Sequence, residues 1–182
     1  MNKKETNELG RIDNQAFQFS PKLPIVVVLD NIRSQHNIGS VFRTADAFRL
    51  SGIALCGITA VPPQPEIHKA ALGATETVSW SYFDNTIDAV LDLKSRGFSI
   101  IAIEQTHESI PLLEYNFVGI DSKIALVLGH EVFGISDNVL ELCDLAIEVP
   151  MFGTKHSLNI SVCAGIVIWD MAKRFIINGF QY

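Results

Sequence analysis

Polar side chains and glycines concentrate in three segments of the chain, each directly after an apolar run typical of a buried strand. The segments are residues 30–47 (DNIRSQHNIGSVFRTADA), 128–136 (LGHEVFGIS) and 149–161 (VPMFGTKHSLNIS). Ligands of open parallel sheets bind at the carboxyl ends of strands, so side chains from these segments can meet in one site. In such a site an arginine guanidinium can stabilise negative charge on an oxygen atom, and a glutamate carboxylate can fix the orientation of an arginine or asparagine side chain. Glycine lets the backbone approach a ligand closely.

Sequence signatures of several other reaction classes are missing. The chain contains no GxGxxG, no GxxxxGK[ST] and no GxSxG motif, which argues against a dinucleotide-binding turn, a triphosphate loop and a hydrolase nucleophile elbow. His130 and Glu131 begin a zinc-protease HExxH pattern, but Gly134 stands where the second histidine is required. The three cysteines are far apart and form no CxxC pair. We therefore predict neither a metal site nor a disulfide framework.

The elements that position the three segments alternate between strand-like and helix-like patterns. We predict strands at residues 25–29, 53–56, 78–83, 98–103, 123–128 and 145–149. We predict helices at residues 38–49, 86–96, 136–143 and 157–177, and a loop with at most one helical turn at residues 61–73. This alternation predicts an α/β fold, in which a parallel sheet is flanked by helices on both faces. Residues 21–182 form a single domain in this prediction, after a loose polar arm of residues 1–20 anchored by Phe17 and Phe19.

The last predicted helix is apolar on nearly every side. Its apolar positions include Leu158, Ile160, Val162, Ile166 and Trp169. A helix of this kind must be covered on every side. In a short chain, a second copy of the same chain is a natural source of that cover.

Composition sets limits on the class of protein. The 182 residues are 48% hydrophobic and 19% charged, which argues against extended disorder. No apolar run reaches membrane-spanning length and the first ten residues are polar, so we expect no membrane helix and no secretory signal; the cysteine usage favours the cytoplasm. The net charge of −6 is unusual for a nucleic-acid-binding domain. Residues 1–50, however, hold seven Lys and Arg against five Asp and Glu, which leaves room for a local basic surface.

The three polar segments contain three motifs in a fixed order. They read Asn37-x-Gly39-x-x-x-Arg43-x-Ala45, Leu128-Gly129-x-Glu131-x-x-Gly134 and Pro150-Met151-x-Gly153-x-x-x-Ser157-Leu158-Asn159. Together, in this order and at these intervals, they resemble the SpoU (TrmH-like) family of SPOUT RNA methyltransferases, over residues 24–173. The resemblance implies a parallel α/β sheet whose C-terminal part forms a deep trefoil knot, and a homodimer. It also implies that loops of the knot hold S-adenosylmethionine, whose methyl group is transferred to a ribose 2′-hydroxyl of tRNA or rRNA.

The resemblance also assigns roles to individual residues. The residues expected to contact the cofactor are Ile103, Glu104, Gly129, Val149, Met151 and Leu158. The residues expected to take part in catalysis are Arg43, Asn37, Glu131, Ser157 and Asn159. A guanidinium stays protonated, so we expect Arg43 to stabilise the forming alkoxide and the adjacent phosphate rather than to act as a base.

Some of these residues also have simpler interpretations. Glu131 could be a solvated loop acid, and Ser157 could serve only as the N-cap of the last helix. Arg33 and Lys155 are expected to contact RNA phosphates, because Lys and Arg supply most of the affinity for the backbone.

Two other functions remain open from the sequence. One is an RNA-binding or assembly protein that keeps the fold and the cofactor pocket without catalysis. Such a protein would be expected to have lost residues of the motifs. Arg43, Glu131 and Asn159 are all present, which argues against it. The other is a SPOUT enzyme that methylates a base nitrogen; the motif containing Asn37 and Arg43 favours ribose instead.

Overall fold

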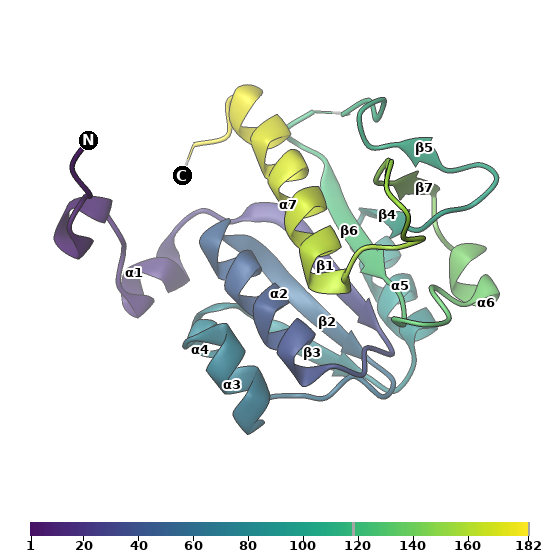
Figure 1. Cartoon of the computed structure of the whole chain (residues 1–182), viewed down its shortest axis with the longest axis horizontal. Coiled ribbons are helices and arrows are strands. Elements are labelled where there is room, and N and C mark those ends of the chain that lie inside the picture. Colours follow the sequence, from purple (N-terminus) through teal and green to yellow (C-terminus); the bar gives the residue numbers. More distant parts are fainter. Residues whose placement is uncertain (118, 182) are drawn as a thin grey trace.

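Within the residues that the structure describes, seven strands form one sheet in which every neighbouring pair is parallel (Figure 1). This computed structural model describes residues 1–117 and 119–181, and of residues 6 and 7 only the backbone. The strands are β1 (Leu23–Asp30), β2 (Leu50–Cys56), β3 (Trp80–Phe83), β4 (Phe98–Ile103), β5 (Ile110–Pro111), β6 (Lys123–Leu128) and β7 (Leu145–Glu148). Their order across the sheet is β3-β2-β1-β6-β4-β7-β5.

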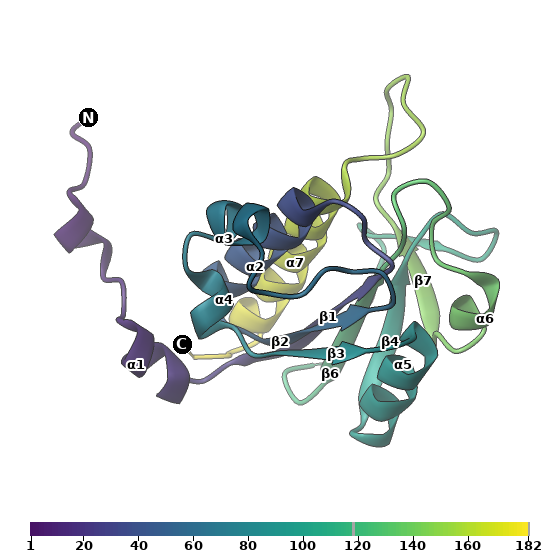
Figure 2. The same cartoon turned by 90° about the horizontal axis from the view of Figure 1, so that it is seen from below.

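Helices cover both faces of the sheet (Figure 2). They are η1 (Thr6–Leu9, a 3₁₀ turn), α1 (Asn14–Phe19), α2 (Gln35–Ala47), α3 (Pro65–Ala71), α4 (Ala74–Thr77), α5 (Thr86–Ser95), α6 (Asp137–Leu140) and α7 (Ile160–Ile177). Helices α2, α3 and α7 pack together on one face, and α5 packs on the other. The predicted α/β architecture with a parallel sheet is therefore confirmed.

The side chains of β1 show how one strand serves two cores. Ile25, Val27 and Leu29 face the core beneath α2 and α7, whereas Val26 and Val28 face the core beneath α5. Successive side chains of a strand point to opposite faces, so a strand buried on both faces must be apolar throughout. This is why the run of residues 25–29 predicts a central strand from sequence alone.

Several local predictions were wrong, among them the loose arm of residues 1–20, which contains η1 and α1, and the helix of residues 136–143, of which only Asp137–Leu140 is helical. Residues 61–73 contain the helix α3, which begins at Pro65; a proline is well tolerated at the start of a helix, where its missing N–H has no partner to lose. The last helix begins at Ile160 instead of residue 157, with Asn159 as its N-cap. In the N-terminal segment Phe17 is buried, but Phe19 is 84% exposed and anchors nothing. The short strand β5 was not predicted.

Helix α7 is the longest helix, and its charged residues include Asp170, Lys173 and Arg174. Among the described residues, no helix combines the length and the apolar character needed to cross a bilayer.

Gly39 of the first motif lies where α2 meets α3. A Cβ atom built on Gly39 would lie 2.5 Å from the carbonyl oxygen of Ile67 and 2.7 Å from the Cβ of Ala70. The two helix backbones can approach this closely only if position 39 has no side chain. Gly39 of the first motif thus has a packing role, and the candidate functional residues of this motif are the polar ones, Asn37 and Arg43.

Replacing Gly39 by Ala is expected to reduce the free energy of unfolding by about 1–3 kcal/mol, the usual cost of overpacking. That loss outweighs the roughly 1 kcal/mol by which alanine exceeds glycine in helix propensity. Urea unfolding measures the change, and Ser40→Ala on the same helix serves as a control expected to stay within about 0.5 kcal/mol. An unchanged or increased stability of Gly39→Ala would contradict the packing role.

Candidate functional site

The carboxylate of Glu131 joins the first two polar segments. Glu131 lies in the loop after β6, and its oxygens accept hydrogen bonds from the backbone N–H groups of Arg33 (3.2 Å) and Ser34 (3.1 Å). They also accept one from the side-chain amide of Asn37 (3.3 Å). Arg33 and Ser34 lie in the turn after β1, and Ser34 is the N-cap of α2. Glu131 therefore holds the start of α2 against the β6 loop and is not merely a solvated loop acid.

Asn37 extends the network to the third segment. Its Oδ1 accepts a hydrogen bond from Nδ2 of Asn159 at 3.2 Å. The Oδ1 of Asn159 in turn accepts from the backbone N–H groups of Ser161 (2.9 Å) and Val162 (3.4 Å), which caps α7. A carboxylate can only accept, so Asn37 must turn its NH₂ to Glu131 and its oxygen to Asn159. The orientation of both amides is thereby determined.

The protonation of Glu131 follows from these contacts. Partial burial by itself raises the pKa of the Glu131 carboxyl group, but the hydrogen bonds from Arg33, Ser34 and Asn37 together outweigh it. The pKa of Glu131 consequently lies below its ordinary value. At neutral pH the group is a carboxylate that accepts hydrogen bonds from every partner described above.

A pocket of about 560 Å³, called the first pocket below, opens beside this network at the carboxyl ends of β4, β6 and β7. All six residues predicted to contact the cofactor line it, namely Ile103, Glu104, Gly129, Val149, Met151 and Leu158. Glu131, Ser157 and Asn159 line it as well. Ser157 lies in the exposed loop before α7, so the interpretation of Ser157 as the N-cap is wrong. The second and third motifs therefore line one pocket, and Asn37 of the first motif is joined to it by its hydrogen bonds to Glu131 and Asn159.

Two glycines let the β6 loop close tightly on one side of this pocket. The backbones of His130 and Gly134 form two hydrogen bonds, of 3.0 and 2.8 Å. Gly134 has a φ of 67°, a conformation that favours glycine. A Cβ on Gly129 would lie 2.3 Å from the carbonyl carbon of Gly134. Backbone groups rather than side chains therefore form this wall of the pocket.

Glu104 connects the end of β4 to the same loop. Its Oε2 accepts from the backbone N–H of Ile135 (3.2 Å), and its Oε1 accepts from that of Gln105 (2.9 Å). A Cβ on Gly134 would lie 2.4 Å from the Glu104 carboxylate, which is a further reason for glycine at that position.

Gln105 and Cys163 also line the pocket and were not singled out from the sequence. The Gln105 side chain donates to the carbonyl of His156 at 2.8 Å, which ties the end of β4 to the third segment. The position of Gln105, two residues after a predicted strand, was the available signal. Cys163 lies one helical turn after Asn159; burial, aided by the charge of Glu104, raises the pKa of its thiol to about 11. The Cys163 thiol is therefore uncharged at physiological pH and forms part of the pocket wall.

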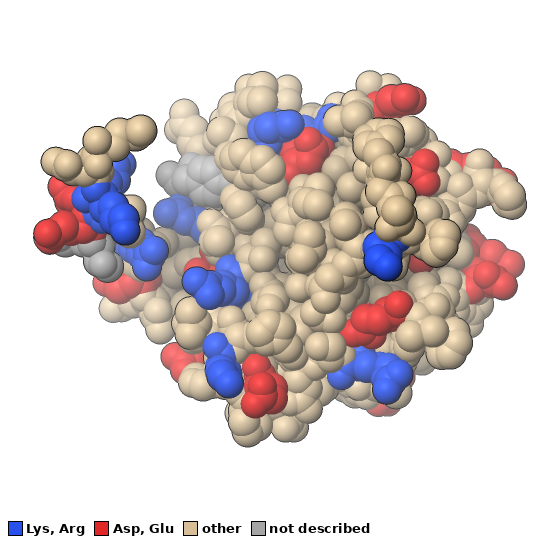
Figure 3. Space-filling view, in the orientation of Figure 1, with Lys and Arg blue, Asp and Glu red and all other residues tan. Residues whose placement is uncertain are grey.

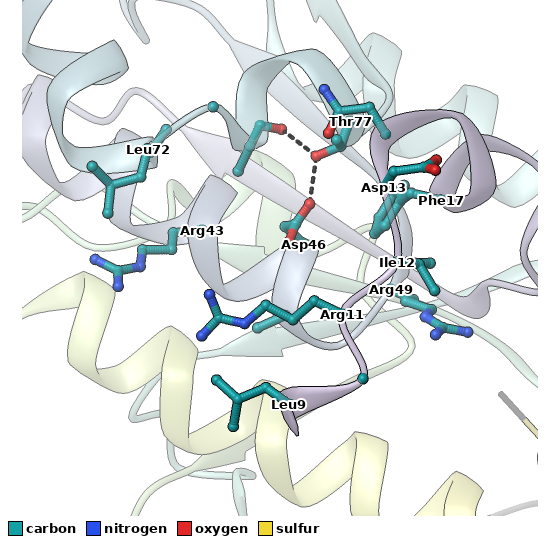
Figure 4. A pocket seen from close by; sticks show the side chains of 16 residues that line it. Leu9, Arg11, Ile12, Asp13, Phe17, Arg43, Asp46, Arg49, Leu72 and Thr77 are labelled. Carbon is teal, nitrogen blue, oxygen red and sulfur yellow. Dashed lines mark hydrogen bonds between the residues drawn. The ribbon is translucent and has the colours of Figure 1, made fainter. Parts of the chain in front are cut away.

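Arg43 does not join the others. It follows Asn37 by six residues on α2, which places it about 9 Å further along the helix axis. There it lines a second pocket, together with Arg11, Asp46 and Arg49 (Figure 4). Within one chain the expected catalytic arginine is therefore separated from the pocket at which the other motif residues meet.

The two residues expected to contact RNA phosphates are on the surface near the first pocket. Arg33 gives its backbone N–H to Glu131 and leaves its side chain exposed. Lys155 is exposed in the loop that carries Met151 and Ser157.

Comparison with known proteins shows the family and the fold. The profile of the SpoU rRNA Methylase family matches residues 24–169. A relative from Neisseria meningitidis, the 23S rRNA (guanosine-2′-O-)-methyltransferase RlmB, is 30% identical over 85% of this chain and 60% of its own length. The chain spans about 60% of the length of the curated relatives it matches.

Two solved structures have the same fold. The AdoMet-bound rRNA methyltransferase from Sinorhizobium meliloti is 27% identical, with a TM-score of 0.75 over 82% of this chain and 56% of that chain. The TrmH/SpoU tRNA modifying enzyme from A. aeolicus is 26% identical, with a TM-score of 0.79 over 91% of this chain and 82% of that chain.

Replacing Glu131 by Gln is expected to lower the free energy of unfolding at neutral pH, because a neutral amide accepts these hydrogen bonds less strongly than a carboxylate. The pKa of Glu131 is lower in the folded than in the unfolded state. Its contribution is therefore complete above the unfolded pKa and is lost as the pH falls through the folded pKa. Urea unfolding of both proteins from about pH 7 to about pH 3 measures the difference, which should shrink toward the acidic end.

The matched control is Glu141→Gln, at an exposed glutamate directly after α6. It should show a much smaller change across the same pH range. A Glu131→Gln effect that is independent of pH would contradict the assignment of Glu131 as the charged centre of the network.

Proposed function

The chain belongs to the SpoU rRNA methylase family, and we propose that it transfers a methyl group from S-adenosylmethionine to a ribose 2′-hydroxyl of tRNA or rRNA. One observation carries the proposal. Asn37, Glu131 and Asn159, one from each motif, form a single hydrogen-bonded chain at the edge of a pocket lined by Gly129, Met151 and Leu158. The relative RlmB is named for methylation of a guanosine 2′-oxygen, which supports ribose over a base as the acceptor.

The first pocket fits S-adenosylmethionine. Its volume of about 560 Å³ falls within the ~300–1,000 Å³ typical of small-ligand sites. The loop at Gly129 and Gly134 brings backbone without side chains to one wall of the pocket, against which an adenine ring would pack closely. The residues that would hold the cofactor are Ile103, Glu104, Gly129, Val149, Met151 and Leu158. When bound, S-adenosylmethionine supplies an electrophilic methyl group carried on a sulfonium.

The chain's own residues would prepare the acceptor. A ribose hydroxyl is a weak nucleophile until negative charge on its oxygen is stabilised. The guanidinium of Arg43, always protonated, would stabilise that charge and contact the neighbouring phosphate. Asn37, Glu131 and Asn159 would hold the walls of the site in position, and Ser157 would offer its hydroxyl to the ribose. Arg33 and Lys155 would contact RNA phosphates at the rim.

A homodimer built on α7 accounts for the separation of Arg43 from the first pocket. Val162, Ile166 and Trp169 are 51%, 39% and 51% exposed, and their spacing places them on one side of α7. Figure 3 shows few charged side chains in the middle of the face that carries α7 and α2. An exposed apolar stripe of this kind is typical of a protein interface. We propose that a second copy covers it and that Arg43 of one copy serves the pocket of the other.

The proposal includes three further points. The C-terminal part, through the loop of residues 149–159 and α7, forms the trefoil knot of the family; an experimentally phased density map tests this path. Residues 21–182 form the methyltransferase domain, to which residues 1–20 are an added segment. The enzyme works in the cytoplasm, where three free cysteines remain reduced.

Incubation with S-adenosylmethionine carrying a tritiated methyl group, and with total tRNA or total rRNA, is expected to label the RNA. Mass spectrometry of the digested nucleosides should find a 2′-O-methylnucleoside. Arg43→Ala is expected to slow transfer by about 100- to 1,000-fold, the usual cost of losing one charge-stabilising donor. Its affinity for S-adenosylhomocysteine, measured by calorimetry, should stay unchanged.

Arg96→Ala is the matched control, because it removes the same charge next to α5 on the opposite face of the sheet. A methylated base in place of ribose would identify a SPOUT enzyme of the other kind. RNA binding without any transfer would favour the RNA-binding protein without catalysis. Full activity of Arg43→Ala would remove Arg43 from the mechanism.

Ile166→Asp is expected to convert a dimer into a monomer in light scattering coupled to gel filtration, since it places a charge in the apolar stripe. Leu91→Asp, at an exposed apolar position of α5, should leave the dimer intact. A wild-type chain that is monomeric would contradict the proposed dimer.

Mixing Arg43→Ala with Asn159→Asp then tests whether Arg43 acts across the interface. Asn159→Asp keeps the cap oxygen of α7 but removes the amide that donates to Asn37. If Arg43 serves the partner's pocket, mixed dimers hold one intact site, and about a quarter of the wild-type activity should return. No recovery after subunit exchange would place Arg43 in the site of its own chain.

A further inference from the structure

A second pocket, of about 810 Å³, lies between the N-terminal segment and α2 (Figure 4). We call it the N-terminal pocket; its walls come from residues 9–14 and Phe17, from the second half of α2 with Arg49, and from residues 71–74 with Thr77. Helix α2 begins at the carboxyl end of the sheet and ends at the amino end, so this pocket and the first one lie at opposite ends of α2. Residues 9–14 precede the family match at residues 24–169.

Two arginine side chains are available for a ligand in this pocket. Arg11 and Arg43 are exposed, and neither has a hydrogen bond or an ion pair with any side chain or backbone group of the described residues. In Figure 4 both extend toward the same side of the pocket, whereas Arg49 points to the opposite side. Unpaired guanidinium groups on one side of a cavity are suited to bind phosphate, because each presents a planar fork of donors.

The acidic residues of the N-terminal pocket are already engaged. Asp46 accepts a hydrogen bond from the hydroxyl of Thr77, which Figure 4 shows away from the two arginine head groups. Asp13 accepts from the backbone N–H of Ala16 at 2.7 Å as the N-cap of α1. The lining of the pocket holds three arginines, Arg11, Arg43 and Arg49, against the two acidic residues Asp13 and Asp46. In a chain of net charge −6, this is a local basic site.

Apolar side chains lie next to the arginines. Leu72 is 68% exposed and Leu9 is 44% exposed, and both line the N-terminal pocket with Ile12. A nucleotide offers the matching pair of surfaces, an anionic phosphate and a flat, largely apolar base. A small anion would use the arginines but leave the apolar walls and most of the volume unfilled.

We propose that the N-terminal pocket binds a nucleotide of the substrate RNA that flanks the methylated one, with Arg11 and Arg43 on its phosphate. This rests on the proposed function, in which Arg43 faces the reacting ribose and the phosphate beside it. Because Arg43 also lines the N-terminal pocket, the strand that leaves the reacting ribose meets Arg11 next. The segment of residues 9–14, which precedes the residues matched by the family profile, then supplies additional RNA contacts.

The test compares Arg11→Ala with the wild-type chain in binding a fluorescein-labelled, single-stranded RNA of 20 nucleotides and mixed sequence. Fluorescence anisotropy over a series of KCl concentrations is expected to show a several-fold weaker affinity at every concentration. The slope of log affinity against log salt should fall by about 0.7, as for one lost phosphate contact to a single strand. In methyl transfer to total RNA, the KM for RNA should rise while kcat and the affinity for S-adenosylhomocysteine stay unchanged.

Arg96→Ala again controls for the loss of one positive charge, and Arg11→Lys should recover part of the affinity because it keeps the charge. Equal RNA affinity of Arg11→Ala and Arg96→Ala would overturn the proposal. So would displacement of the RNA by inorganic phosphate beyond that caused by KCl of equal ionic strength, which would indicate a small-anion site. A change of oligomeric state in Arg11→Ala would overturn it too, because the pocket would then be a protein contact.

The outcome for the proposed function is separate. If the wild-type chain transfers no methyl group but Arg11→Ala still weakens RNA binding and its salt dependence, the proposed reaction fails and the N-terminal pocket remains an RNA site. If methyl transfer occurs and Arg11→Ala behaves like Arg96→Ala, the reaction stands and the N-terminal pocket has no part in it.

Discussion

The hydrogen-bonded chain from Asn159 through Asn37 to Glu131 is the interaction on which the site depends. It runs in one direction because Glu131 can only accept, which in turn orients both amides. Its three members come from the N-terminus of α7, the first turn of α2 and the loop after β6. These three elements are far apart in the sequence. The hydrogen-bonded chain is the contact that joins all three loops beside the first pocket, whereas Gln105 and Glu104 each tie only one of them to the end of β4.

Close backbone contacts complement this polar chain. Gly39 allows α2 to lie against α3, and Gly129 and Gly134 allow the β6 loop to fold back beside the end of β4. In both places a single methyl group would overlap backbone atoms or a carboxylate. Gly129 and Gly134 thus allow the tight loop beside the cavity, while side chains such as Glu104, Glu131 and Asn159 make its lining polar. This division explains why one motif can combine residues of such different chemistry.

In the proposed function, an acidic chain has two clusters of basic side chains that would meet the RNA. Arg33 and Lys155 stand near the first pocket, and Arg11 and Arg43 stand at the N-terminal pocket. The exposed apolar stripe of α7, formed by Val162, Ile166 and Trp169, suits a second copy of the chain. Paired in this way, two copies would align the pocket for the cofactor with the arginines, and local clusters would replace the globally basic surface of many RNA-binding domains.

Sequence alone was sufficient for the elements whose pattern is local. The apolar run of β1 and the strand β4 were predicted, because strand patterns are properties of neighbouring residues. The six residues expected to contact the cofactor came from the resemblance of the motifs to the family, whereas Gln105 and Cys163 of the same pocket were not singled out. The start of α3 at Pro65 was missed, because its proline-rich approach is also typical of a loop. Tertiary structure alone decided that Glu131 accepts a hydrogen bond from Asn37, and that Arg43 lines the N-terminal pocket with Arg11 instead of the first pocket. Contacts between residues distant in the chain depend on how helices and loops pack, which no local pattern contains.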